Sequence, residues 1–309
     1  MATPILIGGK RIGRIRASWL LFKESWRFLA ADKELLLIPV AALVLNLCLL
    51  GIVIGSTVLL TQNSENPLFT GDTLHTLDYV VLFMVYVVGA FTLALSQAAI
   101  THTVYTRLHN GNARLGESIS VALSHAGTLF VWALITSTVG VILRMISERS
   151  QLIGKIVAAL MGAAWAIATF FVIPAIVIDK KGAVESIPFS ITTFKRTWGE
   201  TIVSNITLGL FFFLAYMLAI ISVVGMIILG VYAENLIIIL TALIIGVAWL
   251  VMASLAQAAL EGVIKTVLYI YATDATTPTN FNRELLEAMM VRNPRSTSVV
   301  TPSTAPSLV

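Results

Sequence analysis

Charged residues are scarce in this sequence. Only 12% of the 309 residues are Asp, Glu, Lys or Arg, about half the share that is typical of a globular protein. Apolar residues make up 58% of the chain, and the mean hydropathy is +0.92. A water-soluble globular fold is therefore excluded, and the composition predicts an integral membrane protein.

The sequence has a single cysteine and lacks catalytic motifs. Cys48 is the only cysteine, so an intramolecular disulfide is impossible and redox chemistry is disfavoured. The sequence contains no HExxH, GxSxG or paired CxxC motif, and GGKR at 8–11 lacks the spacing of a phosphate-binding loop. We therefore predict that the protein is not an enzyme and has no cofactor.

Histidines are few, and no metal site is expected. His102 and His109 are seven residues apart and can share one helix face. However, no thiol or carboxylate stands at ligand spacing beside them. We expect ordinary histidines at the membrane interface.

Six long apolar runs are present. Each is about as long as the roughly 20 residues that cross the hydrocarbon core. The runs cover residues 35–60, 79–96, 126–146, 156–178, 202–231 and 235–256. The first run is longer than the apolar region of a signal peptide and lacks a clear cleavage site, so we expect it to remain as the first span. The prediction is an all-α protein with six transmembrane helices.

Lysine and arginine are distributed unevenly between the spans. Seven precede the first span, two lie between the second and third, four lie between the fourth and fifth, and four follow the sixth. The opposite side has only Arg144, Arg149 and Lys155. The positive-inside rule then places both termini in the cytoplasm, in the plasma (inner) membrane. The basic net charge of +4 follows from this topology and from attraction to anionic lipid, so a nucleic-acid partner is not expected.

A nine-residue frame occurs twice, as SWLLFKESW at 18–26 and SITTFKRTW at 190–198. Each copy belongs to an apolar stripe with the spacing 4, 3, 4, which is one face of a helix. The three stripes are Ile15, Trp19, Phe22 and Trp26; Ile119, Leu123, Ala126 and Phe130; and Ile187, Ile191, Phe194 and Trp198. The sequence Glu-Ser-Ile introduces the second and the third stripe.

The repeat predicts three hairpin units, each preceded by a cytoplasmic amphipathic helix at the interface. Within these helices Trp19, Phe22, Trp26, Phe194 and Trp198 are the expected anchors, which face acyl chains or the helix bundle while nearby lysines and arginines meet headgroups. The alternative is a coincidence between amphipathic helices that favour the same residue types.

A second internal similarity links the ends of the second and sixth spans. LSQAAITHTVYTRL at 95–108 corresponds to LAQAALEGVIKTVL at 255–268. Two polar helix stripes result, which consist of Gln97, Thr101 and Tyr105, and of Gln257, Glu261 and Lys265. Equivalent helices of a repeat often face each other around a pseudo-axis, so the stripes are candidates for the lining of a cytoplasmic vestibule. The alternative is that the helices simply become polar where they enter water.

A few other residues have expected packing roles. Arg144 is expected to reach outward and pair with Glu148, and Asn46 and Asn205 to hydrogen-bond between helices. Small residues recur at Gly154, Ala158, Gly162 and Ala166 and at Gly51 and Gly55, as in close helix packing. Pro39 and Pro174 are expected to bend the first and fourth spans.

Several phrases resemble a known protein family. They are SWRFLAADKELLLIPV, TFFVIPAIVIDKKGAVESI, FKRTWGE and ALEGVIKTVLYIYAT. The chain, over residues 15–290, resembles an uncharacterised family of prokaryotic six-pass membrane proteins with a domain of unknown function. More distantly it is similar to the membrane domain attached to some glycerophosphodiester phosphodiesterases, whose soluble catalytic barrel has no counterpart here. The resemblance implies a fold and no activity.

Three regions and a general role are therefore expected. Residues 1–33 form a basic cytoplasmic segment with an interfacial helix, 34–272 the six-span domain, and 273–309 a cytoplasmic tail with a short helix at 281–291 and a disordered end. The predicted function is a scaffold or accessory subunit, or a lipid-organising protein. The expected partners are membrane lipids, with other membrane proteins or a second copy as further candidates. The alternatives are a small transporter or lipid-handling protein with a cytoplasmic vestibule and, with less support, a membrane-embedded hydrolase.

Reporter fusions test the orientation. A reporter that is active only outside the cytoplasm should be active in the loop around Asn66 and inactive after Val309, because basic residues are retained on the cytoplasmic side. A reporter with the opposite requirement is the control. Cytoplasmic activity at Asn66 would contradict the predicted topology.

Overall fold

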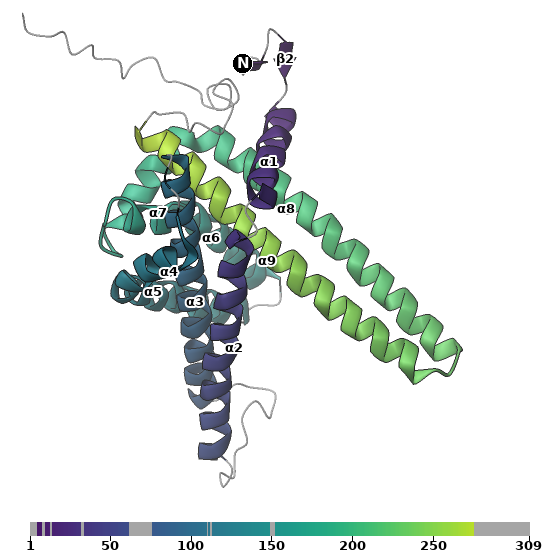
Figure 1. Ribbon diagram of the computed structural model, residues 1–309. Helices are drawn as coiled ribbons and strands as arrows, with labels where there is room; N and C mark the ends of the chain where they lie inside the picture. Colours follow the sequence, from purple (N-terminus) through teal and green to yellow (C-terminus); the bar gives the residue numbers. More distant parts are fainter. Residues whose placement is uncertain are drawn as a thin grey trace, which may run out of the picture.

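The computed structural model describes residues 5–7, 10–12, 14–31, 34–61, 76–109, 111, 113–148 and 152–274. Helices dominate this part of the chain (Figure 1). They are α1 (Arg14–Ala31), α2 (Glu34–Thr61), α3 (Thr76–Leu108), α4 (Leu115–Ser124), α5 (Ala126–Glu148), α6 (Ile153–Ala168), α7 (Val172–Val177), α8 (Ser186–Tyr232) and α9 (Leu236–Asp274). One element was not predicted, a short antiparallel pair of strands β1 (Ile5–Ile7) and β2 (Lys10–Ile12) within the basic segment.

In the described part of the chain, six helical stretches are long and apolar enough to cross a membrane, as predicted. They cover Leu35–Leu59, Asp78–Leu108, Ala126–Glu148, Ile153–Val177, Gly209–Tyr232 and Leu236–Thr273. The helices α3 and α9 continue well beyond the ends of the predicted apolar runs at residues 96 and 256. Both helices continue through the similar segments 95–108 and 255–268, which are less apolar than the preceding runs but still helical. The polar stripes therefore lie on α3 and α9 themselves.

The helix α3 is the centre of the arrangement. It packs against α2, α4, α5 and α9, while α8 and α9 form a long hairpin against which α1 packs. In Figure 1 the outer part of the α8–α9 hairpin extends away from α2 and α3. The fully buried side chains include Ile100, Phe171, Ile176, Leu268 and Tyr269. The core thus lies where one end of α3, α7 and the last turns of α9 meet, and the apolar surfaces of the spans elsewhere are suited to lipid.

The helices that precede the three hairpins differ from one another. Helix α1 is separate from α2, and α4 is separated from α5 at His125 alone, where the helical pattern is interrupted. In contrast, α8 runs for 47 residues from Ser186 to Tyr232 without a break. The predicted third amphipathic helix at 187–198 is therefore the first part of a continuous helix. The grouping into three hairpin units with amphipathic leading helices stays a prediction.

The predicted anchors are divided between two environments. Trp19 and Trp26 are exposed, whereas Phe22 is only 7% exposed and packs between their rings and that of Phe211 on α8. Phe194 is buried as well, beside Phe170 and Phe171. Phe22 and Phe194 thus face the bundle rather than acyl chains. The side chain of Trp198 lies outside the described residues.

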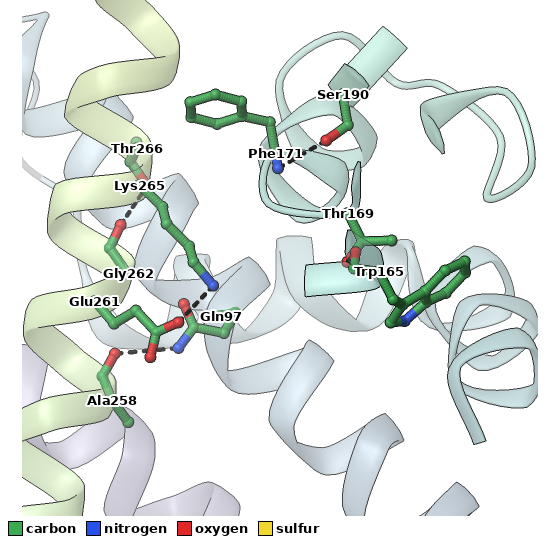
Figure 2. A network of polar contacts seen from close by, with 10 residues as sticks. All are labelled: Gln97, Trp165, Thr169, Phe171, Ser190, Ala258, Glu261, Gly262, Lys265 and Thr266. Atoms are coloured by element: carbon green, nitrogen blue, oxygen red, sulfur yellow. Dashed lines mark hydrogen bonds and ion pairs between the residues drawn. The ribbon is translucent and has the colours of Figure 1, made fainter. Parts of the chain in front are cut away.

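The fourth span is broken between α6 and α7, close to Pro174. Pro174 is the third residue of α7, where its missing N–H removes no helical hydrogen bond, but its ring is incompatible with a continued helix one turn earlier. In the turn, the backbone N–H of Phe171 donates to Ser190 Oγ of α8 at 3.0 Å (Figure 2). The predicted bend is thus a break that α8 stabilises. Pro39 lies inside α2, which continues through it.

Replacing Ser190 should uncouple this break from α8. The Ser190→Ala change leaves the buried N–H of Phe171 unsatisfied, so we expect a loss of about 1–3 kcal/mol in the free energy of unfolding. Thr192→Ala is the matched control, because Thr192 is exposed and bonds only within its own helix. Thermal unfolding in mild detergent measures both. Equal melting temperatures for the two variants would contradict the assigned role of Ser190.

Candidate functional site

The two polar stripes meet where α3 crosses α9, at a contact that we call the junction. Gln97 of α3 is 8% exposed, and its Nε2 donates to the backbone oxygen of Ala258 on α9 at 3.1 Å (Figure 2). One turn further along, Thr266 Oγ1 donates to Thr101 Oγ1 at 3.3 Å, and both hydroxyls are buried. Gln97 and Thr101 therefore face inward, and Thr266 joins them although the sequence stripes did not include it.

Gly262 allows the two helices to approach closely at this point. A Cβ atom on Gly262 would lie 2.7 Å from Ile100 Cγ2 and 2.8 Å from Gln97 Oε1. Both distances are shorter than a Cβ atom tolerates, so only glycine permits the contact without a shift of the Ile100 and Gln97 side chains. Close contact between backbones is the usual function of small residues in membrane helix packing.

Glu261 and Lys265 flank the same junction. Lys265 Nζ lies 2.6 Å from Glu261 Oε1, in the expected pairing, and 5.1 Å from the centre of the Phe170 ring. The two side chains are 35% and 23% exposed. Figure 2 shows the Lys265 ammonium and the Glu261 carboxylate beside Gln97. The pair thus closes the edge of the junction, and the ring of Phe170 provides a further cation–π contact.

The remaining stripe residues lie apart from the junction. Gln257 accepts a hydrogen bond of 2.8 Å from the Tyr216 hydroxyl, so it faces α8 rather than α3. Tyr105 is half-buried and its ring centre lies 4.4 Å from that of His109, whose Nδ1 is 2.8 Å from the Tyr105 carbonyl oxygen. The structure thus brings together Gln97, Thr101, Glu261 and Lys265, while Tyr105 and Gln257 point elsewhere.

Two buried polar contacts near the site were not predicted. The Tyr269 hydroxyl donates to Asp179 Oδ2, which joins α9 to the segment after α7. On α4, Ser118 is fully buried, and its Oγ lies 2.7 Å from Thr103 Oγ1 and 3.3 Å from His102 Nδ1. Ser118 is the serine of the first Glu-Ser-Ile sequence. The recurrence of Glu-Ser-Ile was therefore a sequence signal for a buried serine, which the apolar stripes alone do not give.

Other predicted contacts have mixed outcomes. Asn46 Nδ2 donates to Thr92 Oγ1 at 2.7 Å between α2 and α3, and Arg144 pairs with Glu148 at 2.9 Å, so both predictions are confirmed. The side chain of Asn205 lies outside the described residues. Of the small residues, Gly154 approaches the carbonyl of Ile146, whereas a Cβ atom on Gly51 or Gly55 would meet no atom within 4 Å. The latter two glycines therefore provide no close packing contact within the described part of the chain.

A pocket lies on the other side of α3, away from the polar junction. Its walls come from α2, α3 and α4, its volume is about 100 Å³, and among the described residues Ser96 is the only polar one that lines it. The residues that the vestibule hypothesis named are therefore not the ones that line this pocket. Its lining suits a hydrocarbon chain rather than a polar solute.

Enlarging Gly262 tests the junction. In Gly262→Ala the new Cβ displaces Ile100 and Gln97, so we expect a loss of about 1–3 kcal/mol in the free energy of unfolding. Gly225→Ala on α8 is the control, because a Cβ there meets nothing within 4 Å and alanine favours the helix by about 0.5–1 kcal/mol. Thermal unfolding in mild detergent should therefore move in opposite directions for the two variants. A Gly262→Ala protein as stable as the parent would contradict the close contact.

The comparisons with known proteins give a family without an assigned role. A family model described as "Family of unknown function (DUF6159)" matches residues 76–279, about two thirds of the chain. No curated protein and no solved structure matches significantly. The expected likeness to phosphodiesterase membrane domains stays a prediction. The matched segment contains α3 to α9 and with them the whole junction, and the chain belongs to this family of unknown function.

Proposed function

We propose that the protein is a non-enzymatic membrane scaffold that organises lipid around itself. The observation that carries the proposal is the junction between α3 and α9. Its polar groups bond to one another across a contact so close that Gly262 has no room for a methyl group. A packed junction of this kind supports a fixed arrangement of spans rather than a passage for a solute.

Charge and exposure support a role at the membrane surface and within the lipid. Lys180 and Lys181 lie in the segment between α7 and α8, on the side that the basic residues assign to the cytoplasm. Cationic side chains near the membrane surface attract anionic headgroups. Within the bilayer, α8 and α9 have large exposed apolar side chains such as Ile221, Leu229 and Ile244. The scaffold thus offers contacts to headgroups at one end and to acyl chains along its length.

The apolar pocket beside Ser96 supports the lipid part of the proposal. A pocket between these membrane-spanning helices is accessible to lipid, and its lining is almost entirely apolar. The alternative of a small transporter requires instead that the polar stripes face water. The accessibility of the stripe residues therefore distinguishes the two functions.

Cysteine labelling separates the scaffold from the transporter. In a Cys48→Ala background, Gln97→Cys should react with a membrane-impermeant thiol reagent about tenfold more slowly, or slower still, than Glu185→Cys, because burial excludes the reagent. Gln97 is 8% exposed, while the Glu185 side chain is 66% exposed. Rates are measured in membranes opened on both sides. Equal labelling of both positions would contradict the scaffold and favour a water-filled vestibule.

A second position refines the result. Gln257→Cys reports on the α8 side of α9, where Tyr216 covers the native side chain. The scaffold predicts slow labelling there as well. Rapid labelling at 97 and 257 that an added solute suppresses would identify a transport pathway.

A further inference from the structure

The pocket between α2, α3 and α4 contains a hydroxyl group without a protein partner. Ser96 lines the pocket and is only 4% exposed, and among the described residues its Oγ has no hydrogen-bond partner. An unsatisfied hydroxyl in an apolar site is unfavourable. The hydroxyl therefore points to a ligand that accepts its hydrogen bond.

Two other hydroxyls on α3 bond back to their own helix. Thr92 Oγ1 donates to the carbonyl oxygen of Val88 at 2.9 Å, and Thr103 Oγ1 donates to that of Ala99 at 2.9 Å. Serine in a membrane helix ordinarily bonds back to the preceding turn in the same way. Ser96 departs from this pattern, because its Oγ has no acceptor among the described residues.

The depth of the pocket corresponds to the ester region of a lipid. A hydrocarbon core about 30 Å thick is crossed by about 20 helical residues, so a span that begins at Asp78 leaves the core close to Ser96. The Asn46–Thr92 hydrogen bond fixes the antiparallel register of α2 and α3 and places Ala42 beside Ser96. Ala42 is seven residues inside the first span, which begins at Leu35, so the two helices place the pocket between the boundary of the hydrocarbon core and about 10 Å below it, in the leaflet on the side of α4.

The chemistry of the lining selects an uncharged acceptor. None of the residues that line the pocket is charged, so a free carboxylate would lack a counter-ion. An ester carbonyl is uncharged and accepts the single hydrogen bond that Ser96 offers. The volume of about 100 Å³ admits only a short segment of one chain, since a cavity of roughly 150 Å³ holds one benzene molecule.

From these observations we infer that the pocket binds the ester end of one acyl chain of a glycerophospholipid. Ser96 Oγ donates its hydrogen bond to the ester carbonyl oxygen, and the first methylene groups pack against Ile38, Leu45 and Leu95. The bilayer itself is the source of the ligand, and the partly open side of the pocket lets the rest of the lipid remain in the leaflet. The inference rests on the lipid-organising part of the proposed function and names the ligand and the residue that recognises it.

Comparison of an ester lipid with its ether analogue tests the hydrogen bond directly. The purified full chain is titrated in detergent with dioleoylphosphatidylglycerol or with the corresponding diether lipid, which lacks the carbonyl groups, and bound lipid is counted by native mass spectrometry. We expect the ester lipid to bind about fivefold more tightly at the first site, because one net hydrogen bond distinguishes the two. Equal binding of the two lipids by the unaltered protein would overturn the inference.

Two serine variants assign the preference to a residue. Ser96→Ala should abolish the preference for the ester lipid and leave the binding of the diether lipid unchanged. Ser137→Ala is the matched control, since Ser137 of α5 is likewise buried, at 2% exposed, with an unpartnered Oγ among the described residues, but does not line the pocket. The control should keep the preference. A preference that survives in Ser96→Ala, or is lost in Ser137→Ala, would overturn the assignment.

A pocket-filling variant and a free acid test the site independently of the hydroxyl. Ala42→Leu should weaken the binding of both lipids, because the added side chain occupies the pocket, and unchanged binding would contradict the location. Oleic acid should compete poorly, and tighter binding of oleic acid than of the ester lipid would overturn the choice of ligand. These results are separate from the labelling of Gln97→Cys. Slow labelling of Gln97→Cys without a preference for the ester lipid would support the scaffold and contradict the lipid site. Rapid labelling of Gln97→Cys with a preference for the ester lipid would contradict the scaffold and support the lipid site.

Discussion

The contact between α3 and α9 at Gly262 is the constraint on which the rest of the structure depends. Membrane helices gain little from burying apolar side chains against one another, because lipid is equally apolar, so close packing and buried hydrogen bonds must hold them together. Gly262 supplies the close packing, and Gln97 and Thr266 supply the bonds. The core around Phe171 and Tyr269 is assembled beside this contact, and the outer parts of the spans are left to the lipid.

Much of the fold could be predicted because a bilayer imposes simple rules. Apolar length alone gave the six spans, since every backbone polar group within hydrocarbon must be satisfied inside a helix. The break near Pro174 followed from the geometry of proline. The continuity of α8 did not follow, because an amphipathic stretch such as 187–198 has the same pattern whether or not the helix continues into the next span. The polar stripes placed residues 97–105 and 257–265 in helical register, so the continuation of α3 and α9 beyond the apolar runs was expected.

The candidate site was only partly within reach of the sequence. The stripe on α3 correctly suggested that Gln97 and Thr101 lie on one face, and charge spacing suggested the pair of Glu261 and Lys265. Partners of a residue on a distant helix depend on the crossing angle and the rotation of each helix, which periodicity does not encode. For this reason the bonds between Tyr269 and Asp179 and between Ser190 and the backbone of Phe171 could not be foreseen. That Ser96 Oγ has no hydrogen-bond partner among the described residues can be recognised only from the three-dimensional structure.

The unbroken helix α8 has a mechanical consequence. With 47 residues it is about 70 Å long, more than twice the thickness of the hydrocarbon core. A rod of this length without a joint transmits any tilt at its Ser186 end directly to its Tyr232 end. The fourth span, in contrast, has a joint at residues 169–171, and the hydrogen bond from Phe171 to Ser190 fastens that joint to the rod. The orientation of α7 is therefore coupled, through Ser190, to that of the whole of α8.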